Sequence, residues 1–332
     1  MEKSKFQKSK GISMQSEFFD NKRREFIADC TKFASLAIVA SMAGISPLLA
    51  KDSKTAKAQS KGVKMEFVTL NNGIKMPILG LGTYGLNGKS GQEAISQALQ
   101  VGYRLIDTAQ MYGNEREVGN AVANALAETK REEFFITTKL SSNMSYDETL
   151  RAFETSMKKL RLDRLDLLLI HDTYRNAKQM YKAMERLYKE GAIRALGISN
   201  FKQKDLADFI EGCEIVPAIN QCQTHIFHQQ KFLREVMKKQ GIILQSWSPF
   251  VAGKNDFFHN ATLQKIAKKH NKTVAQVALR FLIEQGIVVI PKTSKRERMQ
   301  ENIAVFDFAL DEGDRATLSA MDTNTSQFGW DS

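Results

Sequence analysis

Polar residues end several short apolar runs of this 332-residue chain at regular intervals. They are Asp107, Lys139, His171, the pair Ser199-Asn200, and Gln221. The spacings from Asp107 through Lys139 and His171 to Ser199 are 32, 32 and 28 residues, and Gln221 follows Asn200 by 21 residues. Each residue alone has an ordinary explanation, since a strand-end aspartate often caps a turn, a lysine is often solvated and a histidine often packs in a core. Together they offer charge, a base and hydrogen-bond donors, which is the chemistry of proton transfer.

A tyrosine joins this group because of the loop that carries it. In "IDTAQMYGNE" the apolar run ends at Asp107, and Tyr112 follows five residues later. A loop of that length lets the phenol lean over the end of the strand that carries Asp107. Tyr112 is therefore a candidate for the same site.

The apolar runs alternate with helical patterns along most of the chain. Between them lie segments with apolar residues at spacings of three and four, such as "EREVGNAVANALAET" and "AKQMYKAMERLYKEG". The eight runs are "ILGLGTY", "RLIDTA", "FFITTKL", "LDLLLIH", "IRALGIS", "PAINQCQ", "IILQSWS" and "GIVVIPK". Short, continuously apolar strands between helices are typical of buried parallel strands. The chain is therefore predicted to be α/β, a closed (β/α)8 TIM barrel.

An Asn-Gly pair in "FVTLNNGIKMPI", residues 67–78, lies between two short alternating runs and predicts an N-terminal β-hairpin cap. An open doubly wound sheet is the alternative fold, but no G-x-G-x-x-G follows the first strand, so we rank it below the barrel. In a barrel the carboxyl ends of the strands form one rim, where barrel enzymes place their chemistry. We expect the strand-end polar residues to converge there.

The net charge of the chain, +11 at pH 7, is unevenly distributed. Residues 1–58 hold eleven Lys/Arg and six Asp/Glu, which leaves 37 and 31 for the rest, a net charge of +6. That charge is not gathered in arginine-rich or aromatic patches, so an anionic small molecule is favoured over nucleic acid as a partner. The cysteines Cys30, Cys213 and Cys222 lack C-x-x-C spacing and indicate neither zinc nor a disulfide framework.

The amino terminus has the order of a signal peptide: a lysine-dotted start, the pair Arg23-Arg24, then eighteen uncharged residues from 33 to 50. The R-R-x-F-I core resembles a twin-arginine export signal. Alanine and serine give the uncharged stretch a low hydrophobicity, which argues against the alternative of an uncleaved membrane helix. Cleavage is expected before Gln59 or after Ala50.

The sequence thus predicts two parts, a signal peptide and linker in residues 1–58 and a barrel domain in residues 59–332. The first part implies the twin-arginine translocase as a partner and a periplasmic or otherwise exported protein. No stable membrane anchor is expected. Retention in the cytoplasm or at the membrane, through a weak signal, stays open as the alternative.

From about Met65 to Asp322 the chain resembles the aldo-keto reductase family. The resemblance is carried by "LNNGIKMPILGLGTY", "IDTAxxYGNE", a strand-end "TTK", "LLIH", "GISNF", "NQ" followed by His225, and "IPKTSKRERMQEN". It implies a barrel enzyme that reduces aldehydes or ketones. Because no side chain can supply a hydride, it also implies a nicotinamide cofactor.

The resemblance assigns the family's catalytic tetrad to Asp107, Tyr112, Lys139 and His171. A phenol has a pKa of about 10, and a nearby ammonium stabilises the phenolate and lowers that value. Lys139 is thus expected to lower the pKa of Tyr112, the implied general acid. Asp107 would hold the charge of Lys139, and His171 would donate or orient a hydrogen bond at the carbonyl oxygen.

The same resemblance implies the cofactor contacts. Ser199, Asn200 and Gln221 would bind the nicotinamide carboxamide, Trp247 would stack on the ring in place of the family's usual tyrosine, and Ser248 would contact the cofactor beside it. At the adenosine end the implied residues are Lys292, Thr293 and Arg298 for the 2'-phosphate, and Glu301 and Asn302 for the adenine. A guanidinium suits a phosphate, so NADPH is expected rather than NADH. Core packing of Trp247 and a solvated "KRER" helix start are the plainer alternatives.

Three features depart from the family pattern. Asp172-Thr173 follows His171 where Trp-Pro or Ser-Pro is common, and Ile226 stands where a proline is usual. Both loops are expected to border the substrate, and the added carboxylate favours small polar or cationic carbonyls over bulky apolar ones. The tail after Asp322 is short, so we expect an open pocket.

The resemblance also leaves a second class of function open. The barrel would then bind NADP(H) as a redox sensor or partner subunit with little turnover, as some non-enzymatic relatives do. The intact tetrad favours the enzyme. A monomer is expected, and the implied mechanism needs no metal ion.

Overall fold

The computed structural model describes residues 65–326 and residue 328. The predicted signal peptide, linker and cleavage positions lie outside these residues, so the division of the chain at residue 58 stays a prediction. Among the helices of the described residues, none has the length and hydropathy that crossing a membrane requires.

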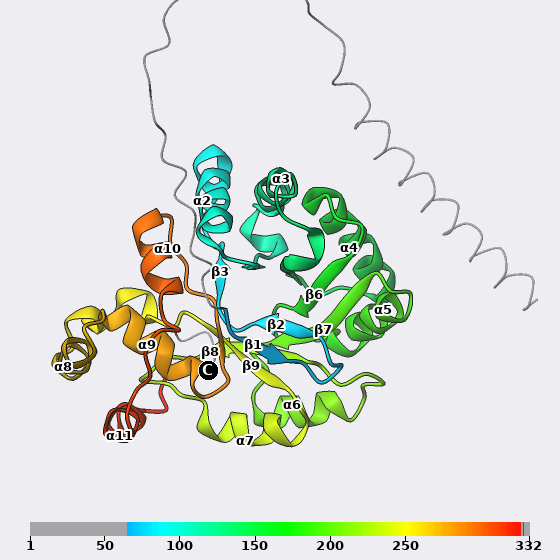
Figure 1. Cartoon of the computed structure of the whole chain (residues 1–332). Coiled ribbons are helices and arrows are strands. Elements are labelled where there is room, and N and C mark those ends of the chain that lie inside the picture. The colour runs from blue at the N-terminus through cyan, green and yellow to red at the C-terminus, as the bar shows by residue number, and fades with distance from the viewer. Residues whose placement is uncertain (1–64, 327, 329–332) are drawn as a thin grey trace, which may run out of the picture. The chain divides into compact units, whose positions relative to one another are not determined.

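In the described part of the chain, eight parallel strands form the centre of the fold (Figure 1). Their order in the sheet follows the chain from β3 to β10. The strands are β3 (Gly80–Gly82), β4 (Leu105–Asp107), β5 (Phe135–Leu140), β6 (Leu165–Ile170), β7 (Ile193–Ser199), β8 (Ile219–Gln223), β9 (Ile243–Trp247) and β10 (Val288–Val289). A parallel bridge between Leu79 and Val289 brings the two outer strands together and nearly closes the barrel. The predicted (β/α)8 fold is confirmed.

A short hairpin precedes the barrel. β1 (Phe67–Thr69) and β2 (Lys75–Pro77) pair antiparallel, and Gly73 in the turn between them has φ +84°, a conformation that glycine adopts without strain. The Asn72 side chain donates to the backbone carbonyl of Arg194 at 2.9 Å. Because Arg194 lies at the start of β7, the hairpin caps the amino ends of the strands and leaves the carboxyl rim to the site.

Helices follow the strands and surround the barrel (Figure 1). They are α2 (Gly88–Val101), α3 (Glu115–Ala125), α4 (Tyr146–Leu160), α5 (Ala177–Lys189), α6 (Gln203–Ile210), α7 (Lys231–Lys239), α8 (Ala261–His270), α9 (Val274–Ile283), α10 (Arg296–Ile303) and α11 (Glu312–Ala320). The 3-10 turns are η1 (Gln110–Tyr112), η2 (Arg131–Glu133), η3 (Val251–Gly253) and η4 (Phe257–His259). At α4 the cap is local, since Ser145 accepts from the N–H of Glu148 and the Glu148 carboxylate accepts from the N–H of Ser145.

The strands are buried on both faces, as their continuous apolar runs require. Every residue of β6, "LDLLLI", is buried. Its one charged member, Asp166, lies near the amino end of the strand, where Arg131 and Arg194 bind its two carboxylate oxygens at 2.6 and 2.7 Å. The two arginines compensate the cost of burying this carboxylate.

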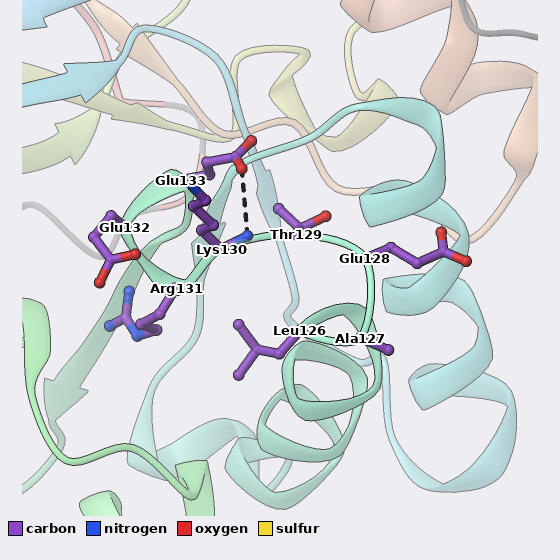
Figure 2. A pocket seen from close by; sticks show the side chains of 8 residues that line it. All are labelled: Leu126, Ala127, Glu128, Thr129, Lys130, Arg131, Glu132 and Glu133. Carbon is purple, nitrogen blue, oxygen red and sulfur yellow. Dashed lines mark hydrogen bonds between the residues drawn. The ribbon is translucent and has the colours of Figure 1, made fainter.

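A hollow of about 540 Å³ lies on the connection between α3 and β5 and is lined by residues 126–133 (Figure 2). The N–H of Lys130 donates to the Glu133 carboxylate at 3.3 Å within this turn. Because the connection leads into the amino end of β5, the hollow lies at the opposite end of that strand from Lys139. It therefore does not belong to the site that the strand ends form.

Candidate active site

Lys139 and Asp107 form a buried ion pair at the carboxyl ends of β5 and β4. Their side chains are 0% and 1% exposed, and Lys139 Nζ lies 2.5 Å from Asp107 Oδ1. The ammonium also donates to the backbone carbonyl of Thr108 at 3.0 Å and to the Tyr112 hydroxyl at 3.3 Å. Three acceptors thus surround its three hydrogens, which fixes the positive charge beside the phenol.

The turn that carries Tyr112 is held in place by its neighbours in the sequence. Tyr112 ends η1, and Gly113 follows at φ +70°, which turns the chain toward α3. The Asn114 side chain donates to the backbone carbonyl of Thr83 at 2.7 Å and accepts from the Thr108 hydroxyl at 2.7 Å. The "YGNE" segment therefore positions the phenol by buried hydrogen bonds that link the ends of β3 and β4.

His171 follows β6 directly and faces the phenol. The backbone N–H of His171 donates to the backbone carbonyl of Leu140 at 3.0 Å. The imidazole meets the Tyr112 ring edge-on, with centroids 5.7 Å apart, and Tyr84 contacts Tyr112 at 5.1 Å. Burial, and then the charge of Lys139, lower the pKa of His171 to about 3. The imidazole is therefore neutral at physiological pH.

The pKa of Tyr112 is raised above that of an ordinary phenol. Burial is the largest cause, and the charge of Lys139 offsets only part of it. Burial also acts against the charged form of Lys139, but Asp107 and Tyr112 outweigh it and raise the pKa of the lysine. Lys139 lowers the pKa of Tyr112, as predicted, but burial outweighs it, and the net pKa of the phenol lies above its usual value. The protonated phenol that results is the form that a proton donor needs.

Gln221, on β8, joins the hydrogen-bond network of this ion pair. Gln221 Nε2 donates to the second carboxylate oxygen of Asp107 at 2.8 Å and to Gln245 Oε1 at 2.9 Å. Ser199, at the end of β7, donates its hydroxyl to the backbone carbonyl of Gln221 at 2.8 Å. The predicted cofactor contacts Ser199 and Gln221 thus lie in the same buried cluster as Asp107, and Gln221 also holds that carboxylate.

Trp247 and Asn200 lie together at the ends of β9 and β7. Trp247 Nε1 donates to Asn200 Oδ1 at 2.9 Å, and Asn200 has φ +64°, which turns the chain out of its strand. Ser248 follows Trp247 at φ +55°. The indole is half-buried and contacts Phe328 at 5.4 Å between ring centroids. Trp247 therefore lies at the rim of the barrel and is not enclosed in its core.

The residues predicted at the adenosine end follow β10 and run into α10. Lys292 and Arg298 are exposed, Thr293 and Asn302 are buried, and Glu301 is half-buried. The N-cap residue of α10 makes no side-chain hydrogen bond to the first turn of the helix. Two exposed cations beside a helix N-terminus without a side-chain cap suit an anionic group.

The two loop departures have different surroundings. Asp172 is exposed directly after His171, and its carboxylate accepts the N–H of Thr173 at 2.8 Å. Ile226 is fully buried in the core. Of these two positions, only Asp172 presents its side chain to solvent beside the tetrad.

Ser141 belongs to this cluster, although neither the strand-end spacing nor the family motifs indicate it. It lies two residues after Lys139, and its Oγ is 2.9 Å from His171 Nδ1. The sequence offers one cue, a hydroxyl close behind the strand-end lysine in "TTKLSS".

The structure brings the four tetrad candidates together at one rim. The carboxyl end of this (β/α)8 barrel thus holds a buried lysine and aspartate, a protonated phenol and a neutral imidazole, which are groups that proton transfer can use. In the region that the structure describes, no group of three or more His, Cys, Asp and Glu side chains is arranged to hold a metal ion.

Comparison with known proteins identifies the family. Residues 78–323 match the model of the aldo/keto reductase family. The chain belongs to that family and is an oxidoreductase.

Relatives match nearly their whole length. The chain is 44% identical over 260 residues to a glyoxal reductase of Bacillus subtilis. The matched region covers 76% of this chain and 92% of that protein. An aldo-keto reductase structure from a Medee basin deep-sea metagenome library is 44% identical, with a TM-score of 0.75 over 78% of this chain and 96% of that one. A Bombyx mori aldo-keto reductase solved in complex with NADP is 32% identical, with a TM-score of 0.75 over 80% of this chain and 95% of that one.

Proposed function

We propose that the protein reduces small aldehydes or ketones to alcohols with NADPH, and that Tyr112 donates the proton. The observation that carries this proposal is the position of one buried ammonium, since Lys139 Nζ lies 3.3 Å from the Tyr112 oxygen and 2.5 Å from Asp107. An ammonium held there stabilises the phenolate that Tyr112 becomes when it gives up its proton. The likeness to a glyoxal reductase supports a small carbonyl substrate.

The side chains of the tetrad divide the work. Tyr112 transfers its proton to the carbonyl oxygen as negative charge develops on that oxygen. Lys139 stabilises the resulting phenolate, and Asp107 holds the ammonium of Lys139 in place. His171, whose ring centroid lies 5.7 Å from that of Tyr112, donates a hydrogen bond to the same oxygen. A proton from water then restores the phenol for the next turnover.

NADPH supplies the hydride when bound. We assign its nicotinamide end to the rim between β7 and β9. Ser199, Asn200 and Gln221 would bind the carboxamide, while Trp247 and Ser248 would lie against the ring. The half-buried indole, tied to Asn200 by its N–H, presents an aromatic surface at that rim.

We assign the adenosine end to the segment after β10. Lys292, Thr293 and Arg298 would bind the 2'-phosphate, and Glu301 and Asn302 the adenine. The exposed cations at the start of α10 support this assignment, as does the relative solved with NADP.

The ratio of kcat/KM with NADPH to that with NADH tests the phosphate assignment. We expect Arg298→Ala to lower this ratio about tenfold or more, because the bidentate contact to the 2'-phosphate is lost. Arg151→Ala, which removes an exposed arginine of α4, is the matched control and should leave the ratio unchanged. Equal use of both cofactors by the unmodified protein would contradict the assignment.

We propose small polar or cationic carbonyls as the substrate class. The exposed carboxylate of Asp172, next to His171, supports it. Because the charge is exposed and screened, Asp172→Asn should lower kcat/KM for a cationic aldehyde only about threefold relative to a neutral aldehyde of similar size. Indifference of that ratio to the substitution would count against this substrate class.

We propose that residues 1–58 direct the protein to the periplasm through the twin-arginine translocase. The Arg23-Arg24 pair and the uncharged residues 33–50 support this proposal. Fractionation of cells with and without the translocase tests it, and the double substitution Arg23→Lys and Arg24→Lys is a second test. We expect export to be lost in cells without the translocase and in the double variant. An unchanged distribution would contradict the proposal.

The proposed reaction is tested by NADPH oxidation with the full chain and a panel of small carbonyls: methylglyoxal, glyceraldehyde, a nitrobenzaldehyde and a keto sugar. We expect turnover with formation of the alcohol. Tight NADPH binding without turnover on any of these compounds would contradict the enzyme and favour the redox sensor or partner subunit.

A further inference from the structure

One hydroxyl, that of Ser141, contacts both halves of the proposed proton-transfer site. Ser141 Oγ lies 2.9 Å from His171 Nδ1 and accepts the N–H of Met111, the residue before Tyr112, at 3.2 Å. The N–H of Ser141 donates to Gln110 Oε1 at 3.2 Å. Ser141 therefore links the turn that carries the phenol to the imidazole that faces it.

The hydroxyl has a single hydrogen, and two acceptors lie within its reach. Lys139 O is 3.3 Å from Ser141 Oγ, and His171 Nδ1 is 2.9 Å from it. Of the two contacts, the one to the nitrogen is shorter by 0.4 Å, which favours a hydroxyl hydrogen directed at His171 Nδ1. Nδ1 is then an acceptor. A neutral imidazole carries one ring hydrogen, which must be on Nε2.

We propose that Ser141 is a positioning residue that holds His171 as the Nε2–H tautomer, so that a hydrogen-bond donor and not an acceptor faces a carbonyl oxygen placed against Tyr112. The catalytic consequence rests on the proposed reductase function, whereas the tautomer does not. The opposite tautomer would point a nitrogen lone pair at the developing negative charge and oppose the reaction.

Nitrogen-15 NMR of the full chain with labelled histidine tests the tautomer directly. The two ring nitrogens of a neutral imidazole have separate shifts, according to which one carries the hydrogen. The chain has five histidines, and the His171 signals are those missing from His171→Asn. The variants are Ser141→Ala, Ser141→Thr, which keeps a hydroxyl, and Ser142→Ala, which removes the neighbouring exposed serine as a matched control.

In the unmodified protein we expect His171 Nδ1 without hydrogen and Nε2 with it, and no titration of either signal above about pH 5. Ser141→Ala should shift the two signals toward a tautomer mixture, whereas Ser141→Thr and Ser142→Ala should retain the original pattern. In the reductase assay Ser141→Ala should lower kcat about tenfold, the effect of one lost hydrogen bond, with an unchanged KM for NADPH.

A hydrogen on Nδ1 in the unmodified protein would overturn the proposal, as would unchanged His171 signals in Ser141→Ala. These results are independent of turnover. The expected spectra without activity on any carbonyl would leave the tautomer established and reject the reductase. Activity with the wrong tautomer would leave the reductase established and reject the role of Ser141.

Discussion

Two buried carboxylates at opposite ends of the barrel have cationic partners of different kinds. Asp166, near the amino end of β6, is 1% exposed and binds two partly exposed arginines, Arg131 and Arg194, at 2.6 and 2.7 Å. Asp107, at the carboxyl end of β4, is equally buried and binds Lys139, which has no exposed surface, at 2.5 Å. The first carboxylate joins charged groups of the scaffold, and the second holds a charge beside a phenol.

The difference between the two sites follows from the shape of the cations. Arg131 has a planar fork of donors, which it directs to Asp166 and to the backbone carbonyls of Phe134 and Arg164. A lysine ammonium is a compact charge with three donors, and Lys139 directs one of them to the Tyr112 oxygen. Of these two buried ion pairs, only the one at the carboxyl end contacts a phenol, and it is the one that we propose supports the chemistry.

The largest expected effect is on kcat, and it distinguishes Lys139, the partner of Asp107, from Arg194, a partner of Asp166. Lys139→Met should lower kcat for carbonyl reduction about a thousandfold or more, because the phenolate of Tyr112 loses its counter-charge. Arg194→Met is the matched control, since it removes a cation from the other carboxylate, and kcat should stay within about twofold. Steady-state kinetics of both variants, with circular dichroism to confirm folding, measures the contrast. Comparable losses of kcat in the two variants would break the comparison.

The second effect is on stability. Asp166→Asn should lower the free energy of unfolding by about 2 to 3 kcal/mol, because two arginines lose their shared carboxylate but remain partly hydrated. Its kcat should not change. Urea unfolding and turnover of the same preparation test both statements together. A fall in kcat that exceeds the lost folded fraction would show that the amino end of the barrel also supports the chemistry.

The smallest expected effect is that of pH on kcat for reduction. The pKa of Tyr112 is raised, so the phenol keeps its proton past its ordinary range, and that of His171 is lowered to about 3, so the imidazole stays neutral. Neither group changes charge between about pH 5 and about pH 9, and kcat for reduction should therefore vary less than about twofold over that interval. A midpoint near neutral pH in the profile of kcat would contradict this electrostatic description of the rim.

The convergence of the tetrad was predictable because the strands are parallel. Asp107, Lys139 and His171 each follow an apolar run, and parallel strands in a closed barrel place such residues on one rim. The cap hairpin followed in the same way from Asn-Gly between two alternating runs. Patterns of this kind depend on the period of the backbone and need no knowledge of side-chain packing.

Features that depend on packing were not predictable. The net pKa of Tyr112 is raised where a lowered value was expected, because burial exceeds the effect of Lys139. The extent of that burial depends on how side chains pack at the carboxyl end of the folded barrel. Gln221 binds Asp107 across 114 residues of sequence, and Ile226 packs into the core although its loop leaves a strand end. Ser141 was missed because its contact with His171 depends on the path of the loop after β5.

The most direct test of the central claim compares Tyr112→Phe with the unmodified full chain under single-turnover conditions with NADPH and a reactive small aldehyde. The substitution removes the proton donor but keeps the ring that contacts Tyr84 and His171. We predict that NADPH binds both proteins with the same Kd and that the rate of reduction falls about a thousandfold or more in the variant. Reduction by Tyr112→Phe at a rate close to that of the unmodified protein would contradict the assignment of Tyr112 as the proton donor.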